Sequence, residues 1–176
     1  MLKILTSLHG RLVGLASKGQ LISRGGLTPG EDSVVNATAS TLAVTQHTHA
    51  GKLITLNRAA GIAVTLPAAE GSGLEFEFLI GTTVTSNTTT IKVANASDVF
   101  VGFVAQAADG GATSNLYETA ATDDTITLNG STTGGIKGDR FKLRDVKLDG
   151  TNAVWVLDGL TSATGTEATP LSATVS

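Results

Sequence analysis

Two histidines separated by one residue are the first candidates for chemistry in this sequence of 176 residues. His47 and His49 flank Thr48 in the segment QHTHA. Residues two apart on a β-strand lie on the same face, so both rings could bind one Zn²⁺ ion. A zinc site needs a third protein ligand, and the sequence contains no cysteine that could supply one. We therefore expect no metal and no cofactor, with His47 and His49 as weak candidates for a metal site.

The carboxylates offer two further possibilities. Glu75 and Glu77 could pass for the paired acids of a glycosidase. Their alternation with apolar residues in LEFEF places them on the polar face of a strand, which favours a solvated or interface surface. Asp98, Asp123 and Asp124 could give oxygen ligands to Ca²⁺, but no D-x-D-x-D-G loop is present. We interpret these aspartates as turn residues whose side chains bind nearby backbone groups.

Motifs of nucleophilic and phosphate chemistry are missing from the sequence. Neither G-x-S-x-G nor G-x-x-x-x-G-K-[ST] occurs. The net charge is −3, and no basic patch with interleaved aromatic residues indicates nucleic-acid binding. No apolar run approaches the ~20 residues of a membrane span. We expect a protein that is not an enzyme and that binds neither nucleic acid nor membrane.

The composition indicates β-structure with a weakly charged surface. Hydrophobic residues make up 41% of the chain but aromatic residues only 4%, so the core must consist mainly of Val, Ile, Leu and Ala. Charged residues make up 15%, against about 25% in an average globular domain. Such a surface can pack against another protein with little charge to desolvate.

Short alternating segments follow one another from about residue 33 onward. KLITLN at 52–57, IAVTL at 62–66 and LEFEF at 74–78 have the period of strands. The predicted core residues are Leu74, Phe76, Phe78, Ile62, Val64, Leu66 and Trp155. The apolar face changes at Asp145, which predicts a bulge there, and residues 149–152 form a predicted hairpin turn.

The pattern predicts an all-β fold, an antiparallel β-sandwich or barrel that is jelly-roll-like, with an extended N-terminal arm. We expect residues 31–160 to form the sandwich or barrel domain. Residues 161–176 are rich in Ser, Thr, Ala and Gly, and we expect a flexible or extended C-terminal tail. Residues 1–30 form the predicted arm, a small hairpin followed by a linker.

The arm is the predicted docking element. It carries four basic residues and no acid before Glu31. Its many apolar side chains, interrupted by glycines, cannot form a core of their own, so they fold onto the body or bind a neighbouring protein; we favour the second. The predicted docking residues are Leu2, Lys3, Ile4, Leu5, Leu8, Arg11, Leu12, Val13, Leu15, Lys18, Leu21, Ile22 and Arg24.

The order of the segments from residue 50 to 103 resembles a known group of proteins. AGKLITLN, GIAVTLPA, LEFEFLIG, TTTIKVAN and DVFVG follow one another, and DRFKLRDVKLDGTNAVWVLDG is similar to a closing hairpin. This order resembles phage capsid decoration (cement) proteins and other small virion structural proteins with β-modules. The resemblance covers about residues 5–160, and the same modules occur in head fibres and tail fibres.

The resemblance implies a structural virion protein on the outer surface of a phage capsid. Its partner would be the major capsid protein, whose subunits it would bridge, most simply as a homotrimer at a three-fold position. An alternative is a head-fibre or tail-fibre adhesive module that binds host surface glycans through exposed loops. A small β-sandwich hydrolase ranks last, because no catalytic constellation supports it.

Overall fold

The computed structural model describes residues 5–6, 12–15, 21–23 and 33–175, with side chains from residue 33 onward. The chain divides into two compact units, Met1–Ser33 and Val34–Ser176. The first unit contains a three-stranded antiparallel sheet of β1 (Leu5–Thr6), β2 (Leu12–Leu15) and β3 (Leu21–Ser23), in that order. Strands β2 and β3 pair where the sequence predicts a hairpin, and β1 adds a third strand.

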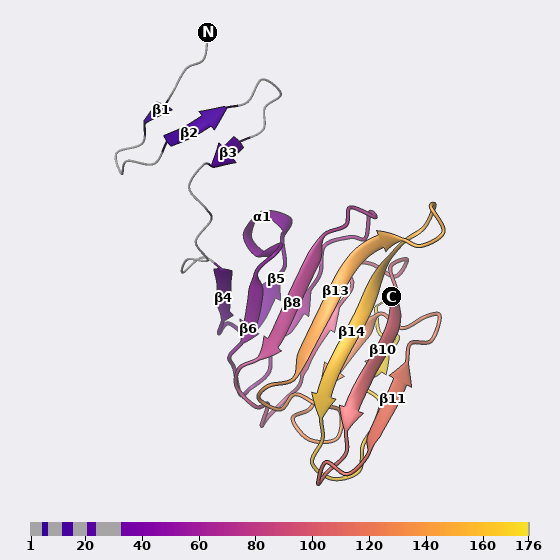
Figure 1. Ribbon diagram of the computed structural model, residues 1–176. Helices are drawn as coiled ribbons and strands as arrows, with labels where there is room; N and C mark the ends of the chain where they lie inside the picture. The colour runs from indigo at the N-terminus through magenta and orange to yellow at the C-terminus, as the bar shows by residue number, and fades with distance from the viewer. Residues whose placement is uncertain (1–4, 7–11, 16–20, 24–32, 176) are drawn as a thin grey trace. The chain divides into compact units, whose positions relative to one another are not determined.

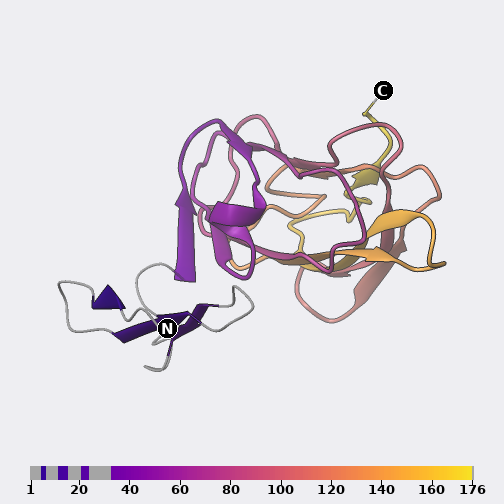
Figure 2. The same ribbon diagram turned by 90° about the horizontal axis from the view of Figure 1, so that it is seen from above.

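The second unit consists of two sheets that lie as two layers (Figures 1 and 2). The larger sheet contains, in spatial order, β11 (Ser114–Glu118), β10 (Phe100–Ala107), β14 (Ala153–Ser162), β13 (Arg140–Lys147), β8 (Glu75–Ile80), β6 (Leu53–Leu56) and β4 (Val34–Ala37). The smaller sheet contains β15 (Leu171–Ser172), β12 (Thr125–Leu128), β9 (Thr89–Lys92), β7 (Ala63–Thr65) and β5 (Thr41–Ala43). A single-turn helix, α1 (Gln46–His49), lies between β5 and β6.

In the first half of this unit, successive strands alternate between the two sheets, so the chain follows a helical path. Strands β4, β6 and β8 lie in the larger sheet, and the strands that follow each of them, β5, β7 and β9, lie in the smaller one. Within each sheet, these strands pair in parallel with the equivalent strand of the next turn. The second half adds antiparallel pairs, chiefly the β13–β14 hairpin, and one long parallel pair between β10 and β14.

The expectation of an all-β fold is confirmed, but two details of it are wrong. Both sheets are open and mixed, so the unit is neither a closed barrel nor an antiparallel sandwich. The jelly-roll-like order is not confirmed, because it requires antiparallel neighbours throughout. Period-2 alternation reports which residues are buried and carries no information on strand direction, which is why the sequence pattern missed the parallel pairs.

The core lies between the two sheets, as the alternation predicts. Phe76, Phe78, Val64 and Trp155 are fully buried, and the rings of Phe76 and Trp155 lie 5.6 Å apart. Ile62 and Leu66 are buried with them, and Leu74 packs against the cluster from a half-buried position. No helix among the described residues is long and apolar enough to cross a membrane.

The C-terminal segment, predicted to be flexible or extended, belongs to the folded unit. Strand β14 continues to Ser162, and Leu171 in β15 is buried and pairs with β12. The Oδ1 atom of Asp124 accepts a hydrogen bond from the Thr174 backbone N–H at 2.8 Å. Residues 161–162 therefore belong to the larger sheet, and residues 171–175 are attached to the smaller one.

The predicted bulge at Asp145 is wrong. Strand β13 pairs with β14 in unbroken register from Arg140 to Lys147. Asp145 lies on the same buried side as Phe141 and Leu143, although it is charged. Its carboxylate binds backbone N–H groups of the loop at 70–72, so the alternation continues with a buried acid in place of an apolar residue.

Candidate functional site: the outer face of the seven-stranded sheet

The side of the seven-stranded sheet that faces away from the core is here called the outer face. On β13 the side chains of Arg140, Lys142 and Arg144 are exposed, while Phe141 and Leu143 are buried. Strand pairing continues this division across the neighbouring strands, because directly opposed residues share a face. The outer face therefore carries a regular two-dimensional array of side chains on rigid backbone.

A group of charged residues occupies the centre of the outer face. The Nζ atom of Lys142 lies 2.8 Å from Oε1 of Glu75, and the Arg144 guanidinium binds Oε2 of the same carboxylate. The hydrogen bond from Lys142, assisted by that from Arg144, lowers the pKa of Glu75 below its ordinary value. A glycosidase general acid needs a raised pKa. Glu75 therefore acts as the shared anion of two surface ion pairs, each worth about 0–1 kcal/mol.

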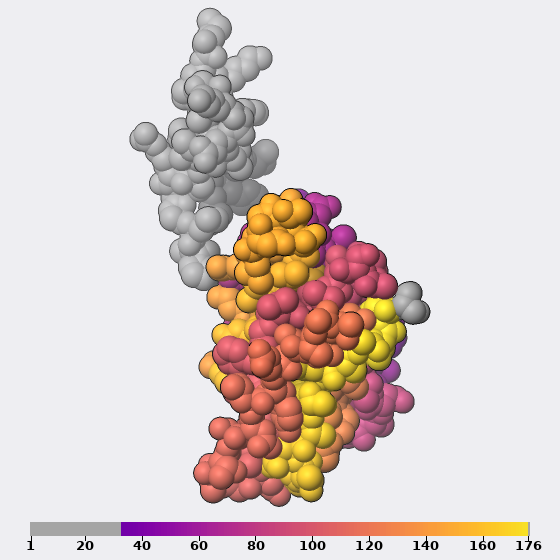
Figure 3. Space-filling model, turned by 90° about the vertical axis from the view of Figure 1, so that its right-hand side faces the viewer, coloured from indigo at the N-terminus to yellow at the C-terminus, as the bar shows by residue number. Residues whose placement is uncertain are grey.

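An apolar patch lies beside this charged group, towards the β11 end of the sheet. Its members, here called the apolar patch, are Val101, Phe103, Leu116 and Leu160, exposed by 38%, 46%, 67% and 42% respectively. Ala105 pairs with Leu116 on one side and with Leu160 on the other, so these three residues form one row across the strands. Figure 3 faces the β11 edge of this sheet and shows residues coloured as β10 and β11 at the surface there.

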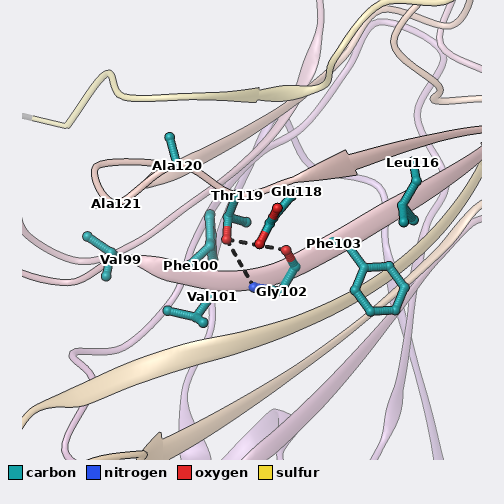
Figure 4. A pocket seen from close by; sticks show the side chains of 10 residues that line it. All are labelled: Val99, Phe100, Val101, Gly102, Phe103, Leu116, Glu118, Thr119, Ala120 and Ala121. Carbon is teal, nitrogen blue, oxygen red and sulfur yellow. Dashed lines mark hydrogen bonds between the residues drawn. The ribbon is translucent and has the colours of Figure 1, made fainter.

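The apolar patch borders a hollow of about 760 Å³ at the junction of β10 and β11. Figure 4 shows Phe103 and Leu116 at one end of the hollow and Val99 with Ala120 at the other. The Thr119 hydroxyl lies between them, 3.0 Å from the Gly102 N–H that donates to it. A Cβ atom on Gly102 would meet the Leu157 carbonyl oxygen at 2.0 Å, so only glycine allows β10 to approach β14 so closely here.

The histidine pair does not form the strand arrangement in which both rings could bind one ion. Both residues lie in α1, where residues two apart point about 200° away from each other around the axis. His47 is exposed, whereas His49 is buried and its Nδ1 atom accepts a hydrogen bond from the Thr45 N–H at 3.0 Å. Within residues 33–175, no three His, Asp or Glu side chains gather as a metal site would require.

Of the three aspartates that we interpreted as turn residues, Asp123 binds the backbone of a nearby residue, whereas Asp98 and Asp124 bind the backbone of distant segments. Asp98 accepts a hydrogen bond from the Ala69 N–H at 3.0 Å, and Asp123 accepts one from the Ala120 N–H at 2.8 Å. Asp124 binds the C-terminal segment, as described above. The prediction is confirmed for Asp123 and wrong for Asp98 and Asp124, whose carboxylates connect segments that are distant in the sequence.

The predicted docking arm is described only in part. Leu5 lies in β1, Leu12, Val13 and Leu15 lie in β2, and Leu21 and Ile22 lie in β3. Leu2, Lys3, Ile4, Leu8, Arg11, Lys18 and Arg24 lie outside the described residues. The docking role of the arm stays a prediction.

The apolar patch was not predicted from the sequence. In the segment VFVGFVA at 99–105, apolar residues occupy both faces of the strand. A strand in a two-layer sandwich buries only one face, so a run without polar alternation predicts that the other apolar face is exposed or covered by a partner. That signal was present in the sequence, and the strand alone could not show which of its faces is the outer one.

The chain matches no protein-family model, no curated protein and no solved structure.

Proposed function

We propose that this chain is a structural virion protein that decorates a phage capsid and bridges neighbouring major capsid subunits on the outer surface. It would act mechanically rather than chemically. Because it binds the assembled lattice and not the separated subunits, it would stabilise the assembled state by mass action. Several weak contacts on one particle would add through their high effective concentration.

The observation that carries this proposal is the apolar patch on the outer face. Exposed apolar side chains held on rigid strands are typical of surfaces that bind other proteins, and here Phe103 lies between Asp158 of β14 and Glu118 of β11. The patch lies beside the ion pairs of Glu75 with Lys142 and Arg144, which provide a polar margin. An apolar centre with a polar margin is the usual composition of a protein–protein interface.

The order of segments that resembles decoration proteins gives separate support. KLITLN contains β6, LEFEFLIG contains β8, and TTTIKVAN contains β9. The closing segment contains β13 and most of β14. The pieces that carry the resemblance therefore lie on strands of one folded unit, with β11 and β12 between the earlier pieces and the final hairpin.

The adhesive alternative has weaker support. Sugar-binding sites commonly present aromatic rings to the solvent. Trp155 is fully buried against Phe76, and Tyr117 is half-buried beside the core. We therefore rank glycan binding second.

The proposal is tested by sedimentation of the full chain with capsids assembled from the major capsid protein of the same genome. We expect the parent chain to pellet with these capsids. Replacing Phe103 by Asp should weaken capsid binding roughly tenfold or more, because it places a charge at the centre of the patch. Leu148→Asp is the matched control, because Leu148 is 62% exposed but lies in the β13–β14 turn. Equal capsid binding by both variants, or no binding by the parent chain, would contradict the proposal.

A further inference from the structure

Strand β11 ends the seven-stranded sheet with an open edge. It pairs with β10, and no other described strand pairs with it. Proteins usually protect such edges with charged side chains, lysine above all, or with proline, a bulge or a covering segment. The strand reads Ser-Asn-Leu-Tyr-Glu, so its one charged residue is Glu118 at the end, and its register with β10 has no bulge. An edge of five residues with neither lysine nor proline is a template for another strand.

The hydrogen bonds at the two ends of the β10–β11 pair show which residues face this open edge. The Thr119 N–H donates to the Gly102 carbonyl at 3.0 Å, and the Ala108 N–H donates to the Thr113 carbonyl at 3.0 Å. Both contacts continue the register of the pair. Hydrogen-bonded positions alternate along an antiparallel strand.

The alternation assigns the remaining positions of β11. Asn115 and Tyr117 lie two and four residues beyond Thr113, so their backbone groups point towards β10. Ser114, Leu116 and Glu118 therefore direct their N–H and C=O groups to the open edge. Leu116 is the midpoint of the strand and also its most exposed apolar side chain, at 67%.

We propose that β11 pairs antiparallel with β11 of a second copy of this chain, about a two-fold axis that passes beside Leu116. This register aligns all five residues of the strand with those of the second copy. It places Leu116 opposite the same residue of the second copy, and Ser114 opposite Glu118. Each of these pairs has outward backbone groups, and each hydrogen-bonded pair exchanges two bonds. The three pairs give about six hydrogen bonds, and a register centred on a neighbouring residue gives fewer.

The side chains are compatible with this register. The two leucines meet on the outer face, each glutamate faces a serine that can donate a hydrogen bond, and Asn115 faces Tyr117. No two like charges lie opposite each other, which would be unfavourable. The row of Leu160, Ala105 and Leu116 continues directly into the same row of the second copy. The contact therefore joins both apolar patches on one side of a continuous sheet.

Cysteine cross-linking tests this register sharply, because the chain has no cysteine of its own. The Cα atoms of a hydrogen-bonded antiparallel pair are about 5.5 Å apart, which is within the range of a disulfide. We expect the full chain with Leu116→Cys to form a covalent dimer on mild oxidation. Ser114→Cys alone should remain uncross-linked, whereas a mixture of Ser114→Cys and Glu118→Cys chains should cross-link.

A cysteine far from β11 provides the control for cross-linking. Leu148→Cys places a thiol at a similarly exposed position in the β13–β14 turn, and it should form no covalent dimer on oxidation. Failure of Leu116→Cys to cross-link above the level of Leu148→Cys would overturn the proposal. Cross-linking of Ser114→Cys alone, at the level of Leu116→Cys, would also overturn it.

A second measurement needs no cysteine. Light scattering should give the mass of a dimer for the parent chain and of a monomer for Leu116→Lys, since that change places two cations opposite each other. Leu148→Lys should remain dimeric. A monomeric parent, or a trimer whose mass Leu116→Lys does not change, would refute the β11 contact. These measurements contain no capsid, so their outcome is independent of the proposed decoration function.

Discussion

The backbone N–H of Gly71 donates a hydrogen bond of 2.7 Å to Oδ1 of Asp145, although the two residues are 74 positions apart. The N–H groups of Glu70 and Ser72 and the Ser72 hydroxyl bind the same carboxylate. Burial on its own would raise the pKa of Asp145, but these hydrogen bonds outweigh it and hold the pKa below its ordinary value. One charged side chain therefore fixes the loop between β7 and β8 to the middle of β13.

Replacing Asp145 by Asn should destabilise the protein by about 1–3 kcal/mol at neutral pH. The amide keeps the shape of the carboxylate but cannot accept hydrogen bonds with both of its polar atoms. Because the folded-state pKa of Asp145 is lowered, its contribution is present above the unfolded pKa of about 3.9 and is lost as the pH falls through the folded-state value. Urea unfolding of parent and variant between pH 7 and pH 3 should show the difference shrinking with acid.

Asp158→Asn provides the comparison for this change. Asp158 is exposed on the outer face, so the substitution should alter the free energy of unfolding by no more than about 0.5 kcal/mol. If Asp145→Asn were no more destabilising than Asp158→Asn, the hydrogen bonds to the loop would contribute nothing to stability.

Asp139 should show the opposite dependence on pH. Burial raises the pKa of this carboxyl, even though Ile136, Gly135 and Ser162 donate hydrogen bonds to it. A raised folded-state pKa gives a contribution that is fully present below about pH 3.9 and is lost as the pH rises through the folded-state value. The free energy of unfolding of the parent, minus that of Asp139→Asn, should therefore fall as the pH rises from about 4 to 7. A difference that grows from pH 4 to pH 7 would contradict a raised pKa for Asp139.

The two aspartates illustrate what the sequence could predict and what it could not. In LEFEF the alternation alone identifies Phe76 and Phe78 as core residues, because the pleat of a strand has a period of two. The same rule failed at Asp145, where the buried position is occupied by an acid whose partners lie in a distant loop. No local pattern contains that information, since the hydrogen bonds exist only after β13 and the loop at 70–72 come together.

The direction of the strands, and which residues lie on the outer face, could not be predicted from the sequence for a related reason. The parallel pairing of β6 with β8 depends on where the chain crosses to the other sheet, which alternation does not record. The position of Phe103 on the outer face could be inferred only when Phe100 and Val104 were known to be buried. The spacing of His47 and His49 is compatible with one face of a strand, yet the two residues lie in a single helical turn.

Replacing Phe76 by Ala should cost about 3–5 kcal/mol, because the ring is fully buried and packs against Trp155. The cavity left between the two sheets cannot collapse without moving several strands. Thermal unfolding followed by circular dichroism measures the effect. Leu148→Ala should unfold at nearly the parent temperature, since Leu148 is 62% exposed. An unchanged melting temperature for Phe76→Ala would contradict the packing described here.

The arm and the body are expected to have different roles, docking for the arm and independent folding for the body. The core residues from Ala37 to Leu171 lie within the unit Val34–Ser176, so this unit has its own hydrophobic core. The basic residues before Glu31 contrast with the acidic remainder of the chain and would suit an acidic partner surface. These two observations predict that the arm contributes to binding and little to the stability of the body.

A chain that begins at Glu31 tests this prediction directly. We expect it to unfold at nearly the same temperature as the full chain. Its circular dichroism spectrum should still be that of a folded β-protein. In sedimentation with undecorated capsids, it should bind less than the full chain, because the arm's apolar and basic side chains are gone. The matched variant is a full chain with Lys3, Arg11, Lys18 and Arg24 changed to Gln. It should bind capsids more weakly than the parent chain, and this difference should be largest at low salt, where charge attraction is least screened. Equal binding by the shortened and full chains would show that the arm does not dock. A shortened chain that fails to fold would show instead that the arm belongs to the body.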